Sequence, residues 1–312
     1  MTPQTLTFTS DGTRCEAWHW PAADDGLTTP AGRPVMVMAH GLGCTKDSGL
    51  GPFAEAFVAL GIDVVAFDYR GFGGSEGTPR GVVSLDGQLA DLAAAIDLAR
   101  ALPGVDRDRV VLWGVSLGGG HVVCAAADRP EVAAVVSLVP IVDGVAAGRH
   151  ALRSHSAGRM LRSTLSGVGS RLRTTTGRQP TTIPVVARPG EVGAITLDGA
   201  YEDMLAIAGP TWRNEIAADV VLELGTRKPY QAARRLDCPW LVQIADLDRS
   251  APPYSALKAA FRGRAEVRHY PGDHFDLFPG KPWHEPAVRH ACRFLSRHLA
   301  VRTETAAERT RV

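Results

Sequence analysis

The chain has 312 residues, of which 45% are hydrophobic and 21% charged, and its formal net charge is +1. These values are ordinary for a globular protein, and the near-zero charge argues against nucleic acid as a partner. No apolar run approaches the roughly 18 residues that cross a bilayer, and residues 1–4 lack the basic and apolar parts of a secretory signal. We therefore expect a cytoplasmic protein without a membrane partner.

The cysteines show no pattern typical of a metal site. The five cysteines are odd in number and widely scattered, without a closely spaced pair or a cluster with histidines. Such a pattern predicts free, mostly buried thiols and indicates neither a metal site nor another cofactor.

The first part of the chain alternates strands and helices. Residues 5–9 and 14–20 predict a β-hairpin that turns at Asp11-Gly12. The apolar run 34–39 is typical of a strand buried on both faces. We expect a helix over 47–60 and a strand over 63–67 after it.

The alternation then continues. Residues 84–101 carry leucines, isoleucine and alanine at spacings of three and four, which predicts an amphipathic helix. The apolar runs 110–115 and 132–139 predict two further strands. Crossovers of this length allow parallel pairing. The sequence thus favours an α/β fold with a mostly parallel central sheet flanked by helices.

At residue 144 this rhythm breaks. Residues 144–235 are rich in glycine and threonine, with helical patches near 149–165 and 200–207 and a short strand over 183–187. We interpret residues 144–235 as an inserted cap, or lid.

The alternation resumes with a strand over 239–245 and a helix over 253–261, followed by a strand over 265–270 and a helix over 284–300. Residues 1–143 and 236–300 would together form the core. The polar, charged residues 301–312 are typical of a flexible tail.

One motif organises the chain. Gly114-Val115-Ser116-Leu117-Gly118 has the pattern Gly-x-Ser-x-Gly between the strand 110–115 and a helix-like segment. The glycines let the backbone bend sharply enough to project a serine hydroxyl from the corner. We interpret this corner as a nucleophile elbow that carries Ser116. The Leu117 N–H and the N-terminus of the following helix would face the reacting carbonyl.

With these motifs the chain resembles the α/β-hydrolase-fold serine hydrolases, with a cap after the sixth core strand. The resemblance implies the chain order nucleophile, acid, histidine. Ser116 is the nucleophile, and His274 in Gly272-Asp273-His274 is the base. The resemblance covers residues 5–300 apart from the cap.

The acid of this triad has three candidates. Ala245-Asp246-Leu247-Asp248, followed by Pro252, resembles the family's Gly-x-x-Asp frame and favours Asp248, with Asp246 as the nearer alternative. Asp143 is a third, because some members of the fold take their acid after the preceding strand. Asp276 is expected only to make hydrogen bonds within its loop.

The resemblance also places a second oxyanion-hole donor in His40-Gly41-Leu42-Gly43, at the N–H of Leu42. We expect His40 to brace this loop and His121 to pack or hydrogen-bond inside. The segment Asp68-Tyr69-Arg70-Gly71 also recurs in the family, where it shapes a loop behind the active site.

These residues predict hydrolysis of a carboxylic ester or thioester through an acyl-serine. The partner would be a small-molecule acyl substrate. Amidase or peptidase action, carbon–carbon bond hydrolysis and acyl transfer to another acceptor use the same triad. A ligand-binding protein on the hydrolase scaffold is a further alternative.

Between Gly144 and Gly190 the cap carries eight arginines and no acidic residue. One interpretation is a positive lid that steers an anionic substrate toward Ser116. The favoured one is a set of helices whose arginines face water while an apolar side covers the site. That side would comprise Leu152, Met160, Leu161 and Leu165.

Overall fold

The computed structural model describes residues 2–151, 157–226 and 228–300. Its centre is an eight-stranded sheet in the order β1-β2-β4-β3-β5-β6-β9-β10. β2 pairs antiparallel with both β1 and β4, and the other neighbours pair in parallel. The strands are β1 Gln4–Ser10, β2 Thr13–Trp20, β3 Arg33–Ala39, β4 Asp63–Phe67, β5 Val105–Val115, β6 Val132–Leu138, β9 Trp240–Ala245 and β10 Glu266–Tyr270.

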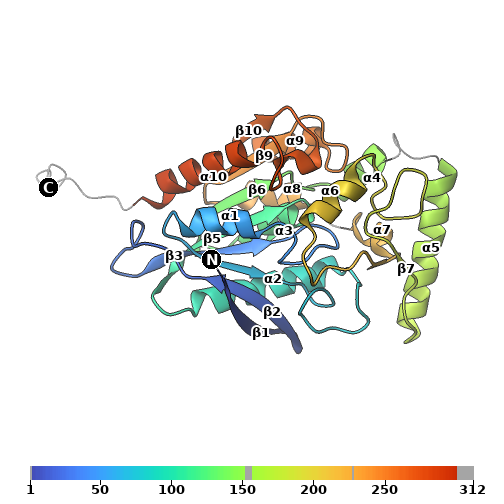
Figure 1. The fold of residues 1–312 in the computed structure, drawn as a ribbon, viewed down its shortest axis with the longest axis horizontal. Helices are drawn as coiled ribbons and strands as arrows, with labels where there is room; N and C mark the ends of the chain where they lie inside the picture. Colours follow the sequence, from blue (N-terminus) through green and yellow to red (C-terminus); the bar gives the residue numbers. More distant parts are fainter. Residues whose placement is uncertain (1, 152–156, 227, 301–312) are drawn as a thin grey trace, which may run out of the picture.

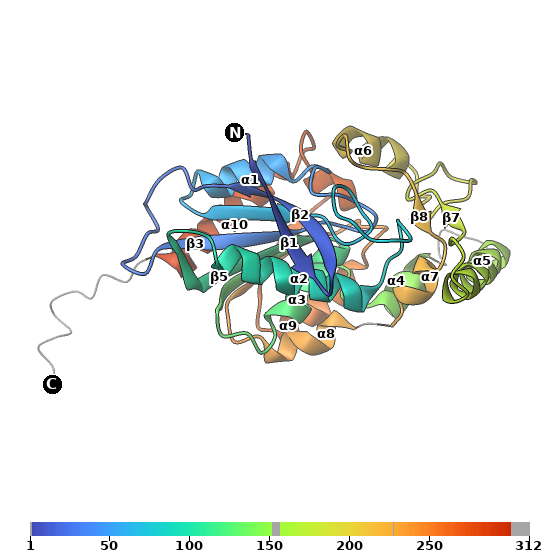
Figure 2. The same ribbon diagram turned by 90° about the horizontal axis from the view of Figure 1, so that it is seen from below.

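Helices cover both faces of this sheet (Figure 1). Those on one face are α1 Gly51–Val58 and α10 His284–Leu299. Those on the other are α2 Leu85–Arg100, α3 Leu117–Ala126, α8 Pro229–Ala232 and α9 Pro253–Arg262, as Figure 2 shows. Every residue of β4 and β9 is buried, and apart from Asp63 and Gln243 these strands are apolar rather than alternating. The predicted α/β architecture is confirmed.

The chain leaves the core after β6 and forms a separate group of elements beyond the carboxyl ends of the parallel strands (Figure 1). The elements between β6 and α8 are α4 Gly144–Ala151, α5 Ala157–Thr175, β7 Thr182–Ile183, α6 Ala200–Ile207, β8 Ile216–Ala217 and α7 Val220–Glu223. α8 precedes the expected boundary at residue 236 and packs against α3 and α9, followed by the short helix η1 Ala233–Arg235. We call residues 144–226 the cap segment below.

Several predicted boundaries differ from the observed ones. α1 begins at Gly51 rather than 47, because Ser48 N–H donates to the Thr45 carbonyl and forms a turn. β7 ends at Ile183 because Pro184 has no N–H to continue the ladder. The predicted helix 149–165 is instead α4 and α5, which ends at Thr175; residues 152–156 lie outside the described residues.

The favoured interpretation of the cap helices is wrong at Leu165, whose exposed fraction is 63%. α5 turns its small residues inward: Gly167 lies against Ala218 and Val221, and the Ser170 hydroxyl donates to the Thr181 carbonyl. A stripe of apolar side chains therefore faces solvent. The side chains of Leu152, Met160 and Leu161 lie outside the described ones.

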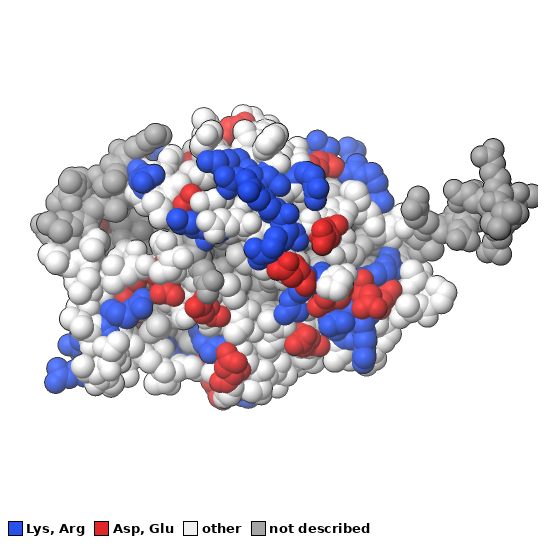
Figure 3. All heavy atoms as spheres, turned by 180° about the vertical axis from the view of Figure 1, so that it is seen from behind, with Lys and Arg blue, Asp and Glu red and all other residues white. Residues whose placement is uncertain are grey.

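Two of the described arginines of the cap segment are paired with acidic side chains. Arg171 pairs with Asp219 and Glu223, and Arg188 pairs with Glu202; these three acidic residues lie beyond the acid-free stretch. On the back of the molecule, the described lysine and arginine side chains gather across the middle of the face (Figure 3).

Candidate active site

The turn between β5 and α3 is built on close backbone approaches. A Cβ at Gly114 would lie 2.3 Å from the Gly118 carbonyl oxygen, and one at Gly118 would lie 2.3 Å from the Ala39 oxygen. Real Cβ atoms do not approach so closely, so any side chain at either position would push the turn apart. Both glycines of the Gly-x-Ser-x-Gly pattern are therefore required by the geometry of the turn.

Ser116 sits at the corner with φ +56° and ψ −117°, which is rare for a residue with a side chain. Such a conformation costs of order 1–3 kcal/mol and persists only where the surroundings enforce it. Here the Ser116 N–H donates to the Leu138 carbonyl, and the Ile141 N–H donates to the Ser116 carbonyl, both at 2.9 Å. Backbone bonds to β6 and its continuation thus hold the strained residue.

His274 and Asp248 meet at the carboxyl ends of β10 and β9. His274 begins the short helix η2 His274–Leu277, and its Nδ1 lies 2.7 Å from Asp248 Oδ2. The other carboxylate oxygen accepts the N–H groups of Ser250 and Ala251 at 2.7 and 2.6 Å. Both side chains are buried, so this pairing fixes the orientation of the imidazole. Nε2 is then the ring nitrogen that is not bonded to Asp248.

An ion pair that the sequence analysis missed connects the loop of Asp248 with the loop of His274. Arg249 donates from its backbone and its Nε to Asp273, at 2.9 and 2.5 Å. Asp273 also accepts the N–H of His274 at 2.8 Å. The sequence contained a signal for this pair. Arg249 directly follows Asp248, Asp273 directly precedes His274, and the two side chains carry opposite charges.

The loop that carries Leu42 lies directly against the elbow. A Cβ at Gly41 would be 3.3 Å from Ser116 Cβ. Leu117 is the first residue of α3, and N–H groups in a first helical turn have no partner within the helix. The N–H groups of Leu42 and Leu117 thus belong to two segments that flank Ser116.

This loop is anchored by a buried lysine that the sequence analysis did not single out. Lys46 is fully buried, and its Nζ lies 2.6 Å from Asp68 and 2.8 Å from Glu16. Asp68 also accepts the Lys46 backbone N–H at 2.7 Å. Burial by itself lowers the pKa of Lys46, but the two carboxylates outweigh it and raise that pKa, so the ion pair stays charged.

The alternative acids are engaged elsewhere. Asp246 lies on the surface beside His269, with 2.6 Å between Oδ1 and Nδ1. Asp143 accepts the Ala146 N–H at the start of α4. Asp276 accepts the Asp273 N–H at 2.8 Å within its own loop, as expected. Among the candidates, Asp248 is the one that contacts His274.

The remaining histidines near the elbow are buried. His40 Nδ1 lies 3.0 Å from the Gly41 carbonyl, which agrees with the expected bracing of the loop. His121 bonds to Gln88 at 2.9 Å, and burial lowers its pKa to about 3. Both therefore stay neutral beneath the site.

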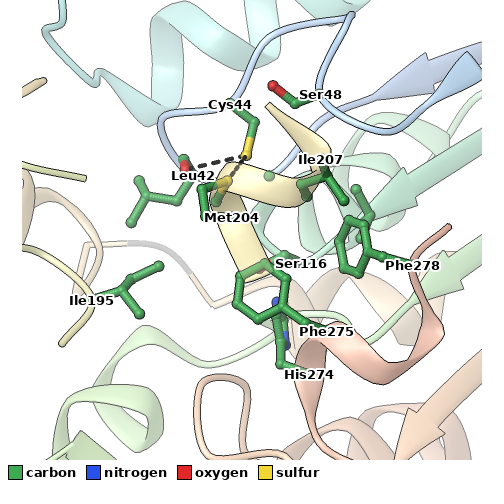
Figure 4. Close-up of a pocket in the computed structure, with 12 residues that line it drawn as sticks. Leu42, Cys44, Ser48, Ser116, Ile195, Met204, Ile207, His274, Phe275 and Phe278 are labelled. Atoms are coloured by element: carbon green, nitrogen blue, oxygen red, sulfur yellow. Dashed lines mark hydrogen bonds between the residues drawn. The ribbon is translucent and has the colours of Figure 1, made fainter. Parts of the chain in front are cut away.

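Ser116 and His274 line one small cavity of about 20 Å³ between the core and the cap segment. Figure 4 shows their side chains below α6, which brings Met204 and Ile207 to the cavity. Within the described residues, no hydrogen bond joins Ser116 to His274. The lining is otherwise largely apolar: Leu42, Val115, Ile195, Met204, Ile207, Phe275 and Phe278.

Cys44 is a second nucleophile type in this lining. Burial raises the pKa of its thiol to about 12, so it stays protonated and unreactive. All five cysteines are free.

In the ranges that the structure describes, no three His, Cys, Asp or Glu side chains are grouped so as to hold a metal ion. None of the helices described there is long and apolar enough to span a membrane.

Comparison with known proteins agrees with this geometry. A family model described as Hydrolase_4, serine aminopeptidase, S33, matches residues 30–272. The chain belongs to this α/β-hydrolase family. The hydrolase is 36% identical to the quorum-quenching protein AidA of Acinetobacter baumannii over 304 residues, which are 96% of each chain.

Two fungal relatives match a part of this hydrolase. The thiohydrolase aneE of Aspergillus aculeatus is 32% identical over 178 residues, which are 56% of this chain and 55% of aneE. The polyketide transferase grgF of a Penicillium species is 32% identical over 135 residues, 43% of this chain and 44% of grgF.

Solved structures share the whole fold of this hydrolase. The crystal structure of the α/β hydrolase GrgF from Penicillium superposes with a TM-score of 0.78 at 24% identity. The complex of DcsB with its substrate analogue gives the same values. In both cases the match covers 96% of this chain and 100% of the other.

Proposed function

We propose that this protein is a serine hydrolase that cleaves a carboxylic ester or thioester through an acyl-enzyme on Ser116. The observation that carries the proposal is the cavity shared by the strained Ser116 and the Asp248-bound His274. A serine held at a strand-to-helix corner, an imidazole beside it and a buried carboxylate behind it are the parts of a serine-hydrolase triad.

In this mechanism the Ser116 hydroxyl attacks the carbonyl carbon while His274 Nε2 takes its proton. The carbonyl oxygen becomes an anion that accepts the N–H groups of Leu42 and Leu117. His274 then gives the proton to the departing alcohol or thiol. Water, activated by the same imidazole, releases the acid and restores Ser116. Asp248 orients the imidazole and stabilises its cationic form.

The lining of the cavity favours an acyl substrate over a peptide. An aminopeptidase must bind a free ammonium group, which needs an anionic partner to leave water. The described lining of this cavity contains no aspartate or glutamate and is mostly apolar. The names of aneE and grgF refer to thiohydrolysis and polyketide transfer, which supports acyl chemistry.

Labelling with a fluorophosphonate, followed by intact mass, tests the proposal. We expect one adduct on the wild-type protein and none on Ser116→Ala. Cys44→Ala is the matched control, because it removes the other nucleophile type in the cavity and should keep the adduct. Labelling of Ser116→Ala, or an unlabelled but folded wild type, would contradict an activated Ser116.

The pH dependence gives an independent prediction. Burial by itself lowers the pKa of His274, but the charge and hydrogen bond of Asp248 outweigh it, so its pKa lies above 6.5. The imidazole must be neutral to accept a proton, so kcat/KM should rise with pH and reach half its maximum above pH 6.5. A midpoint below 6.5, measured with a substrate that does not ionise, would contradict His274 as the base.

The size of the cavity predicts which residues limit the acyl chain. A space of about 20 Å³ holds about one water molecule, so Met204 and Ile207 of α6 occupy the place of an acyl group. Met204→Ala is expected to raise kcat/KM for octanoyl relative to acetyl aryl esters by roughly tenfold. Leu205→Ala is the control, because the neighbouring side chain faces solvent and should leave the ratio unchanged.

A further inference from the structure

A second cavity, of about 490 Å³, lies on the other side of the Leu42 loop. Its walls combine core residues 43–45 and 71–81 with cap residues 179–182 and 211–215. This volume falls within the range of small-molecule sites, roughly 300–1,000 Å³. The cavity around Ser116, in contrast, measures about 20 Å³.

The lining of the second cavity is more polar than that of the first. Hydroxyl and amide side chains reach it from both the core and the cap segment, and they are Thr45, Thr78, Gln179, Thr182 and Thr211. Thr78, Gln179 and Thr182 are exposed, so their polar groups are available to a bound molecule. A molecule with hydrogen-bonding groups suits this surface.

The lining of the second cavity carries a net positive charge. Arg80 donates to the Ser75 and Gly73 carbonyls at 2.8 Å each, so its guanidinium is fixed by neutral acceptors. Across the described ranges, neither Arg80 nor Arg213 forms a salt bridge. Glu215 is the acidic residue in the described lining, which leaves an excess of one positive charge. Guanidinium groups bind carboxylate and phosphate through paired hydrogen bonds.

We propose that this cavity is a binding site for a small, hydroxyl-bearing molecule with a carboxylate or phosphate group. Arg80 and Arg213 bind the anionic group, and the exposed side chains of Thr78, Gln179 and Thr182 bind the neutral part. The site is distinct from the acyl-transfer cavity, and binding to it does not require that Ser116 is a nucleophile.

The Leu42 loop separates the two cavities. Gly41, Leu42 and Cys44 line the cavity of Ser116, whereas Gly43 and Thr45 line the second one. The cap holds this loop beside the second cavity: Trp212 Nε1 donates to the Gly43 carbonyl at 3.0 Å. A bound anion therefore contacts the segment that carries the Leu42 N–H. Its effect on turnover rests on the proposed function, whereas its binding does not.

Calorimetric titration of the full chain tests the site with three probes on one pyranose scaffold: glucose 6-phosphate, glucuronate and glucose, at constant ionic strength. We expect saturable binding of at least one anion and none of glucose. Which anion binds tells whether phosphate or carboxylate is recognised. Absence of saturable binding by both anions, or equal binding of glucose, would overturn the proposal.

Variants locate the binding. Arg213→Gln, an exposed residue, should raise Kd by roughly tenfold because a charge-assisted contact is lost. Arg178→Gln, an exposed arginine of the cap segment outside the lining, is the matched control and should bind as the wild type does. Arg80→Gln should also weaken binding. Unchanged Kd in both Arg213→Gln and Arg80→Gln would overturn the assignment.

The same titration on Ser116→Ala separates this site from the proposed function. Equal Kd is expected there, since Ser116 lies outside the second cavity. Loss of binding in that variant would place the anion in the acyl-transfer cavity and overturn a distinct site. In wild type, a saturating anion should change kcat for an aryl ester, and Arg213→Gln should lose that response at the same concentration. A kcat unaffected at saturation would overturn the coupling.

Discussion

Replacing Ser116 with alanine is expected to lower kcat/KM for an aryl ester or acyl thioester by about 10⁵-fold or more. The acyl-enzyme cannot form without the hydroxyl, and the remaining rate enhancement would come from the oxyanion hole and substrate binding alone. Steady-state kinetics with freshly purified protein, checked for the absence of a fluorophosphonate adduct, measure the effect.

A second substitution shows whether Ser116 acts together with His274. Because groups in one triad are not additive, Ser116→Ala/His274→Ala should be about as slow as Ser116→Ala alone. Melting temperatures serve as the fold control. If Ser116→Ala keeps turnover within tenfold of wild type, the acyl-serine mechanism is wrong and another group carries the reaction.

Asp248→Asn should lower kcat by about 10⁴-fold while the protein stays folded. An amide at this position no longer stabilises the imidazolium and favours the wrong tautomer of His274, whose Nδ1 lies 2.7 Å from Asp248. The pH midpoint of the residual activity should also fall, because the carboxylate is what raises the pKa of His274 against the effect of burial.

Asp246→Asn is the matched control for this change. The two aspartates are two residues apart, but Asp246 pairs with His269 at the surface. Its replacement should alter kcat by less than about threefold, as is usual for exposed ion pairs. Equal losses in Asp246→Asn and Asp248→Asn would show that the acid has been assigned to the wrong residue.

Much of this molecule can be predicted from local sequence, because the elements with strong periodicity are also the buried ones. The strand over 63–67 is observed as β4 with the same bounds. The elbow at Ser116 is recognisable from its neighbouring glycines and two adjoining elements. The sequence signal of such features lies within about ten residues.

The contacts that complete the site depend on distant segments. Lys46 reads as a loop lysine, and only the fold brings Asp68 and Glu16 to it in a fully buried position. α5 is a stronger example: its apolar stripe predicts a buried face, yet Gly167 and Ser170 face the protein. Periodicity indicates which residues share a face but not which neighbour that face meets.

The position of the cap in the chain has a consequence for how activity is assembled. Ser116 and Leu42 come from the part before the cap segment, whereas Asp248 and His274 come from the part after it. The two parts join where β6 pairs with β9, from Val135 opposite Trp240 to Leu138 opposite Gln243. During synthesis, the proposed nucleophile therefore has no base until this seam closes. A single cleavage within the cap segment would place the proposed nucleophile on one fragment and its proposed base on the other.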